Sequence, residues 1–248
     1  MLDFLLKFPD LLHSAIVFGT VIMFGALGEI ITEKSGNLNL GVPGIMYFGG
    51  IAGLTSTFMY ENVYCVNAGI EPSAALCVIM CLVASFLASA LGGLIYSFLT
   101  ITLRTNQNVT GLTLTILGSG VGNFFGGSLI KLSGSEVPSI ALSATSAYFS
   151  KSLPIAETTG WFGQVFLSYG FLAYLAIVVA LLASYFLKHT RAGLHLRAVG
   201  ESAATADAAG INVTKYKYLA TCVGSMIAGL GGLYYVMDYA CGVWSNNA

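Results

Sequence analysis

Long uncharged stretches alternate with short charged ones along the whole chain. Runs without Asp, Glu, Lys or Arg cover residues 11–28, 35–60, 72–103, 105–130, 158–187 and 218–237. Each run approaches or exceeds the roughly 18–20 residues that an α-helix needs to cross the hydrocarbon core of a bilayer. Because the apolar residues are continuous rather than alternating, helices are favoured over the strands of a barrel. The pattern predicts an all-α, polytopic transmembrane helical bundle with about six spans.

Composition supports a membrane protein and excludes a soluble globular one. Only 8% of the 248 residues are charged and 56% are hydrophobic, whereas soluble domains carry roughly 25% charged residues. The first apolar run has no strongly basic start and is longer than the core of a secretion signal, so we expect it to be retained as a span. We expect a single transmembrane domain over residues 1–248, surrounded by lipid, with no nucleic-acid partner.

Positive charge is concentrated in one connection. Five of the ten Lys and Arg residues lie between residues 188 and 217. Because basic residues are enriched in cytoplasmic loops, this pattern predicts a cytoplasmic loop over residues 188–217. Seven basic residues then lie inside, with Lys34 and Arg104 among them, and three lie outside.

The basic loop also carries the signals of a short helix. Ser202 is a suitable N-cap, residues 203–209 have high helix propensity, and Gly210 suits the left-handed position that follows a helix. A mere connection would not need such caps, so the segment predicts a docking element on the cytoplasmic side.

A run of helix breakers follows the first span. Residues 37–44 read Asn-Leu-Asn-Leu-Gly-Val-Pro-Gly, and at membrane depth such a run is tolerated only where helices bury it or where it lines a cavity. A pathway element and a plain turn both remain open. Neutral polar residues of the fourth span could likewise bond a hydroxyl-rich or heterocyclic solute or bond between helices. The candidate pathway residues are Asn37, Asn39, Gly41, Gly44, Asn106, Gln107, Thr110 and Asn123.

Glycine spacing points to packing rather than to nucleotide binding. Gly118, Gly122 and Gly126 share one helix face, which predicts a close contact with a neighbouring helix. Residues 28–35 superficially match a phosphate-binding loop, but Glu33 replaces the required second glycine. We therefore expect no ATP bound by this chain itself.

No catalytic or metal-binding arrangement emerges from the sequence. His13, His189 and His195 are scattered, and the cysteines form no metal-ligand motif, so we expect no enzyme, no metal site and no bound cofactor. A disulfide between Cys65 and Cys241 is an open possibility. Glu29 and Asp238 are the ionisable residues nearest membrane depth, where both ion binding and a structural role are conceivable, with the structural role favoured.

Two long motifs resemble a known family, the permease subunits of ATP-binding-cassette (ABC) importers for ribose-type sugars, nucleosides and branched-chain amino acids. Residues 193–211, with Gly193-Leu194 at the start and Ala208-Ala209-Gly210-Ile211 at the end, resemble the coupling segment that docks on the ATPase. Residues 28–44 resemble the nucleoside and simple-sugar members. The coupling residues implied are Gly193, Leu194, Arg197, Gly200, Glu201, Ala204, Asp207, Ala208, Gly210 and Ile211.

The resemblance implies a bacterial inner-membrane protein that moves nucleosides or simple sugars. It also implies three partners: an ABC ATPase subunit that binds the ATP, a second permease subunit, identical or different, and an extracytoplasmic solute-binding protein. Ser202-Ala203 replaces the Asn-Pro of many members. Relatives continue through further spans after the position of Ala248, so we expect a fragment or a truncated member. The alternatives are a gradient-driven carrier or channel that acts without an ATPase, and a non-transporting membrane scaffold.

Overall fold

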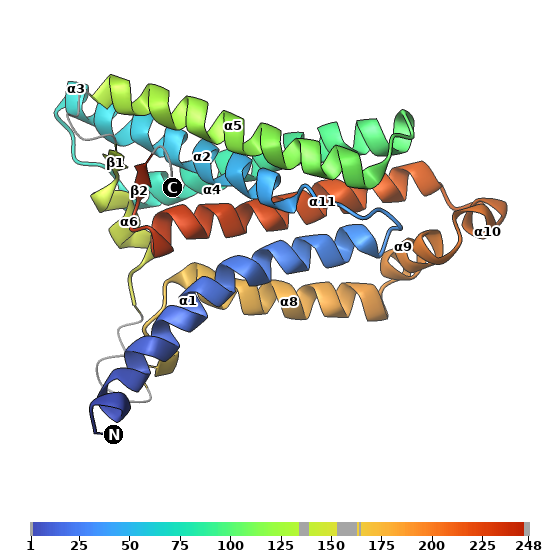
Figure 1. Ribbon diagram of the computed structural model, residues 1–248, viewed down its shortest axis with the longest axis horizontal. Coiled ribbons are helices and arrows are strands. Elements are labelled where there is room, and N and C mark those ends of the chain that lie inside the picture. The colour runs from blue at the N-terminus through green and yellow to red at the C-terminus, as the bar shows by residue number, and fades with distance from the viewer. Residues whose placement is uncertain (1, 134–138, 153–162, 164, 246–248) are drawn as a thin grey trace.

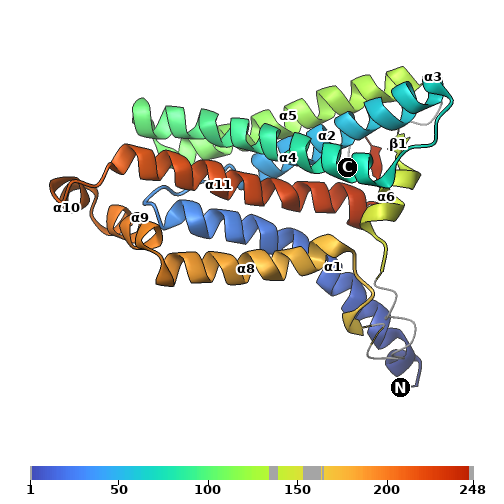
Figure 2. The ribbon, with the colours of Figure 1, turned by 180° about the vertical axis from the view of Figure 1, so that it is seen from behind.

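Six long helices lie side by side along the long axis of the molecule (Figures 1 and 2). The computed structural model describes residues 2–133, 139–152, 163 and 165–245. The long helices are α1 (Leu2–Glu33), α2 (Val42–Phe58), α4 (Ala74–Ser97), α5 (Gln107–Ser133), α8 (Phe171–His189) and α11 (Val213–Tyr234). The prediction of an all-α, polytopic helical bundle is confirmed.

The expected number of spans differs in one place. Among the residues that the structure describes, five helical stretches are long and apolar enough to cross a membrane: Leu11–Glu33, Ala74–Thr102, Gln107–Lys131, Phe171–His189 and Val213–Tyr239. The remaining expected span, at residues 35–60, is α2, which has only 17 α-helical residues. It is short because the breaker residues before Val42 are not helical. The chain then continues into the π-helix η1 (Met59–Cys65) and the short helix α3 (Val66–Ala68).

Small elements cover the two ends of the bundle. The π-helix η2 (Phe98–Thr102) extends α4, and α9 (Arg191–Glu201) and α10 (Ala203–Ala208) lie at the same end. The other end carries α6 (Ser143–Phe149), the π-helix η3 (Tyr235–Tyr239) and two strands. Strands β1 (Ser139–Ala141) and β2 (Val243–Ser245) pair antiparallel, with Ile140 opposite Trp244. Three-residue strands leave too short an alternation to be read from the sequence.

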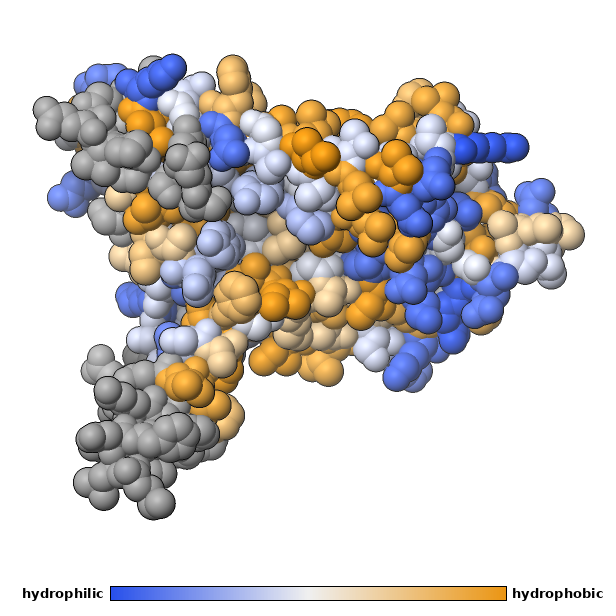
Figure 3. Space-filling view, viewed as in Figure 1, coloured by the Kyte–Doolittle hydropathy of each residue, from blue (hydrophilic) through white to orange (hydrophobic). Residues whose placement is uncertain are grey.

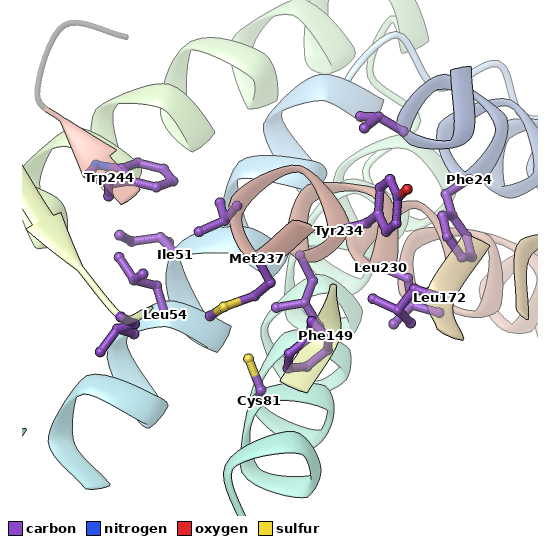
Figure 4. Packing of buried hydrophobic residues seen from close by; sticks show 14 of the residues in the cluster. Phe24, Ile51, Leu54, Cys81, Phe149, Leu172, Leu230, Tyr234, Met237 and Trp244 are labelled. Atoms are coloured by element: carbon purple, nitrogen blue, oxygen red, sulfur yellow. The ribbon is translucent and has the colours of Figure 1, made fainter. Parts of the chain in front are cut away.

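Helix α11 is the centre of the packing and contacts α1, α2 and α4 along its length. Glycines allow these close approaches: an added Cβ at Gly28 would collide with the Gly224 carbonyl, and one at Gly49 with the Gly229 carbonyl. The main apolar cluster joins α1, α2, α8 and α11 with α6 and η3, and Figure 4 shows Phe24, Leu172 and Met237 within it. The expected glycine ridge is part of the same packing, since a Cβ at Gly118 would collide with Gly44 of α2.

The cysteines do not form the disulfide that the sequence left open. All five, Cys65, Cys77, Cys81, Cys222 and Cys241, are free thiols. Cys65 is buried at the end of η1, whereas Cys241 is exposed in a left-handed turn with φ 51°. The conceivable Cys65–Cys241 disulfide is therefore absent from the structure.

Candidate coupling and translocation site

Helix α9 turns the end of α8 back toward α11. The Thr190 hydroxyl caps it by accepting a hydrogen bond of 3.0 Å from the Gly193 amide. Leu196 is buried in a small apolar cluster with Ile31 of α1 and Ala220 of α11. The sequence reasoning missed this helix because glycines and charged residues make its sequence resemble a loop. The signal that could have found it is the apolar spacing at Leu196 and Val199, which are three residues apart.

Helix α10 confirms the expected short helix of the basic loop. The Ser202 hydroxyl accepts a hydrogen bond of 3.3 Å from the Thr205 amide, which satisfies an otherwise free donor of the first turn. Gly210 follows the helix with φ +81°, the left-handed conformation in which glycine is free of strain. Both capping residues therefore have the positions that the sequence predicted.

The predicted coupling residues divide into an exposed group and a packing group. Most of the predicted coupling residues are exposed. Leu194 is apolar and is nevertheless 56% exposed. The exposed set comprises Leu194, Arg197, Glu201, Ala204, Asp207, Ala208 and Gly210, with Ile211 half-buried. We call the surface formed by these residues the α9–α10 surface.

Gly193 and Gly200 instead hold α9 against the bundle. A Cβ at Gly193 would collide with the Phe186 carbonyl at the end of α8, and one at Gly200 with the Lys34 carbonyl. Gly36, at φ +83°, also lies against Gly200: a Cβ at Gly36 would be 3.3 Å from the Gly200 Cα. The α9–α10 surface is thus joined by direct backbone contact to the chain that follows α1.

That chain, residues 34–41, is non-helical and is called the connector below. Its residues alternate: Ser35, Asn37, Asn39 and Gly41 are buried, while Leu38 and Leu40 are 40% and 42% exposed. Polar side chains therefore point into the bundle and leucines point out of it. An unpaired backbone inside a membrane protein needs hydrogen-bond partners from its neighbours.

Helices on every side provide those partners. The Glu29 carboxylate of α1 accepts a hydrogen bond of 2.7 Å from the Asn39 amide, and Gln107 Oε1 of α5 accepts one of 2.9 Å from the Leu38 amide. The Tyr96 hydroxyl of α4 donates to the Leu38 carbonyl, and the Thr115 hydroxyl of α5 donates to the Leu40 carbonyl at 3.2 Å. The connector is therefore anchored to α1, α4 and α5 at once.

The predicted pathway residues occupy three different kinds of position. Asn37, Asn39 and Gln107 are brought together in the connector network, where Asn37 Nδ2 donates to the Thr221 hydroxyl of α11 at 3.4 Å. Asn106 accepts hydrogen bonds from the amides of the first turn of α5, and the Thr110 hydroxyl donates back to the Asn106 carbonyl.

The two glycines and the last asparagine of the set lie elsewhere. Gly41 and Gly44 pack against α5, where added side chains would meet Gly111 and Leu114. Asn123 is exposed on α5, away from the connector. The structure therefore brings only part of the predicted set together.

The two ionisable residues near membrane depth differ in their partners, and each has one buried carboxylate oxygen without a hydrogen-bond partner among the described residues. Glu29 fixes the connector through Asn39. The carboxylate of Asp238 lies against Gly170, which caps the first turn of α8, so that a Cβ added at Gly170 would collide with it. The structural role that the sequence favoured therefore has a hydrogen bond behind it at Glu29, and at Asp238 it stays a prediction.

A pocket of about 460 Å³ opens between α1, α2, η3 and β2. Its rings come from four elements: Phe18, Tyr47, Tyr235 and Trp244. Pro43, the second residue of α2, also lines it, two residues after the end of the connector. We call this cavity the aromatic pocket. The sequence could not indicate it, because its rings are separated by up to 226 positions along the chain.

Neutral polar side chains accompany the aromatic pocket along α5. Thr115, Ser119 and Asn123 recur every fourth residue and are half-buried or exposed. Ser119 lies two turns before Gly126, which packs against Trp244 of the pocket, so this polar stripe is on the pocket side of α5. Paler residues interrupt the apolar surface between α5 and α1 in Figure 3.

Several helices long and apolar enough to span a membrane, packed around a buried non-helical connector, define a multi-pass membrane protein. The chain belongs to the family of branched-chain amino acid transport system permease components, whose model matches residues 11–248. This membership confirms the resemblance found in the sequence.

Several relatives are themselves named as ABC transporter permeases. TsgC13 of Haloferax volcanii, provisionally named a glucose ABC transporter permease protein, is 31% identical over 93% of this chain and 63% of its own length. The nucleoside ABC transporter permease protein NupC of Lactococcus lactis is 28% identical over 90% of this chain and 65% of its own length. The guanosine ABC transporter permease protein NupQ of Bacillus subtilis is 28% identical over 92% of this chain and 67% of its own length.

The chain therefore spans about two thirds of the length of these curated relatives. No solved structure matches it significantly.

Proposed function

We propose that this chain is a membrane-spanning permease subunit of an ABC importer that moves nucleosides or simple sugars across the bacterial inner membrane. In this proposal a partner ATPase binds and hydrolyses the ATP, a second permease subunit completes the pathway, and an extracytoplasmic binding protein delivers the solute. The names of the relatives support the transport class and the range of solutes. The observation that carries the proposal is the contact between the α9–α10 surface and the connector.

Charge supports a cytoplasmic position for the α9–α10 end. Seven of the ten Lys and Arg residues belong to segments that end at this side of the bundle, and three belong to the opposite side. In Figure 3 hydrophilic residues lie at both ends of the molecule, with the larger group at this end. Because short cytoplasmic loops are enriched in basic residues, we assign this end to the cytoplasm, where an ATPase is available.

The chemistry of the α9–α10 surface suits a protein partner. Leu194 offers an exposed apolar side chain, while Arg197, Glu201 and Asp207 offer charges of both signs. Apolar anchors give binding energy, and the surrounding charges select the partner and orient it. Small residues such as Ala204 let α10 enter a groove on that partner.

Motion of this surface would reach the pathway through Gly200. Because the backbone of Gly200 is in direct contact with Lys34, a movement of α9 toward the bundle would push on the start of the connector. The connector in turn ends two residues before Pro43, which lines the aromatic pocket. We infer that closure of the ATPase moves α9, that the connector follows, and that access to the pocket changes from one side of the membrane to the other.

The polar stripe supports a second permease subunit on the pocket side of α5. Exposed amide and hydroxyl groups are costly against lipid and are found where they face another helix or a water-filled cavity. Thr115, Ser119 and Asn123 are neutral, so they can exchange hydrogen bonds with an uncharged solute without holding it tightly. A pathway between two such faces is consistent with both features.

Solute-stimulated ATP hydrolysis by the reconstituted complex tests the proposal. Arg197→Glu reverses a charge on the α9–α10 surface, and Gly210→Pro removes the left-handed residue that follows α10; both are expected to abolish the stimulation while leaving membrane insertion intact. Lys188→Glu is the matched control, because Lys188 is exposed in the last turn of α8, outside that surface.

The result can also contradict the proposal. Unchanged stimulation in both variants, or solute uptake by the chain without any ATPase, would favour a gradient-driven carrier or channel. Capture of the ATPase by the intact chain, lost when residues 191–211 are deleted, provides an independent check on docking.

A further inference from the structure

We propose that the aromatic pocket binds the heterocyclic ring of a neutral nucleoside. The inference rests on the proposed transport function and narrows its solute from nucleosides or simple sugars to nucleosides. It assigns the site to residues of α1, α2, η3 and β2, which the sequence motifs did not include.

The first argument is the concentration of rings. Tyr47 and Trp244 meet edge to face with their centroids 6.2 Å apart, and both line the pocket together with Phe18 and Tyr235. Every planar base has a π-face, so a base can stack on such side chains whatever hydrogen-bond donors and acceptors it carries. A sugar without a base would use only the weaker contacts of its C–H faces.

The second argument is charge. The described residues that line the pocket include no Asp, Glu, Lys, Arg or His, and their polar side-chain groups are two phenol hydroxyls and one indole N–H. A zwitterionic amino acid or a phosphorylated nucleotide would lose hydration there without gaining a counter-charge, which costs several kcal/mol. The lining therefore favours an uncharged ligand.

The third argument combines size and surroundings. A volume of about 460 Å³ lies within the range of roughly 300–1,000 Å³ that is typical of small-molecule sites. The indole Nε1 of Trp244 is not free to reach the ligand, since it points at Gly126. Ser119 and Asn123 do not line the pocket; they lie beside it on α5, where the Ser119 hydroxyl donates to the Ile116 carbonyl and can still accept a hydrogen bond from a ribose hydroxyl.

Trp244 provides a direct reporter for this site. The chain has two tryptophans, Trp161 and Trp244, so Trp161→Phe leaves the pocket residue as the chain's only indole. Uridine or guanosine, titrated into the complete permease complex in nanodiscs with any tryptophans of the other subunits replaced, is expected to change the Trp244 fluorescence saturably. D-Ribose and D-glucose at the same concentrations are expected to leave it unchanged.

Variants then test whether the rings hold the base. Tyr47→Leu and Tyr235→Leu are each expected to weaken binding of radiolabelled uridine roughly 5- to 100-fold, as loss of one stacking partner does for bound bases. Phe125→Leu is the matched control, because Phe125 is an aromatic residue of α5 that lines a different pocket on the other side of α2.

The possible outcomes separate this inference from the proposed function. Full uridine affinity in both tyrosine variants, or no Trp244 response in a complex that still transports nucleosides, would overturn the pocket while leaving the transport function intact. An equal response to glucose would overturn the preference for a base. A response to added phospholipid that nucleosides cannot compete away would assign the pocket to lipid. If no solute stimulates ATP hydrolysis, the proposed function itself fails.

Discussion

Gly200 of α9 packs directly against the Lys34 carbonyl, in a contact that has no room for a Cβ. The two residues are 166 positions apart in the chain. One belongs to an exposed helical pair and the other begins a buried, non-helical segment. This contact gives the α9–α10 surface a mechanical route into the bundle that does not pass through a long helix.

A methyl group at this contact is expected to uncouple the two ends of that route. Gly200→Ala should lower solute-stimulated ATP hydrolysis about tenfold or more, because overpacking of this kind costs about 1–3 kcal/mol and must be relieved by moving α9 away from Lys34. Basal hydrolysis and ATPase binding should persist, since the α9–α10 surface is unchanged. Wild-type stimulation in Gly200→Ala would show that this contact does not transmit motion.

An added methyl group at the contact between α2 and α5 is expected to lower the stability of the protein. Gly118→Ala should lower the thermal unfolding temperature of the detergent-solubilised protein, because the added Cβ would collide with Gly44. Gly120→Ala, two residues further along α5, would place its Cβ more than 4 Å from every described atom outside the neighbouring turns of α5 itself. It should match the wild type or exceed it slightly, since alanine stabilises a helix by roughly 0.5–1 kcal/mol over glycine. Equal unfolding temperatures in the two variants would contradict the packing role.

The helical bundle could be predicted because its cause is local. Each uncharged run is long enough to be a span by itself, and the caps Ser202 and Gly210 act within one turn of α10. The run at residues 35–60 predicted the helix that contains α2, but an uncharged run does not reveal that this helix starts only at Val42. Helix α9 was missed because Gly193 and Gly200, which weaken a helix in isolation, are needed for contacts with Phe186 and Lys34 that only the fold creates.

The candidate site was only partly predictable for the same reason. The breaker run marked the connector, since asparagines and glycines at membrane depth are unusual wherever they occur. Its anchors were not marked: Glu29, Tyr96 and Thr115 come from three helices, and each reaches the connector through tertiary packing. The aromatic pocket depends on rings that no periodicity relates.

The hydrogen bond between Glu29 and the Asn39 amide is expected to stabilise the connector. Glu29→Ala would leave that amide without its acceptor, at a cost of about 1–3 kcal/mol, and should lower both the unfolding temperature and the uptake rate. Glu29→Gln keeps an acceptor oxygen in the same place and should retain most of the stability. If the two variants are equally impaired, it is the charge of Glu29 that is needed, and the favoured structural role would be replaced by a functional one.

The N-cap of α10 is expected to control the order of the docking surface. Ser202→Ala removes the acceptor for the Thr205 amide and should cost about 0.5–2 kcal/mol of helix stability. Hydrogen exchange of the amides in residues 203–208 should accelerate, with little change in α11. Ser202→Asp retains an acceptor and a favourable charge at the helix N-terminus, so its exchange should stay near the wild-type rate. Unaltered exchange in Ser202→Ala would mean that partners other than the cap hold α10.

The side of the membrane on which each end lies can be tested with the exposed thiol of Cys241. This residue lies between η3 and β2, and β2 is at the end of the bundle opposite α9 and α10. A membrane-impermeant maleimide should label Cys241 in intact cells whose outer barrier has been opened. In a background with Cys241 replaced by serine, Asp207→Cys should be labelled only after the inner membrane is permeabilised, because seven of the ten basic residues hold its end in the cytoplasm. Cys65 is the internal control, since it is buried and should react only after unfolding. The reverse order of labelling would place the α9–α10 surface outside the cell, where no ATPase could dock.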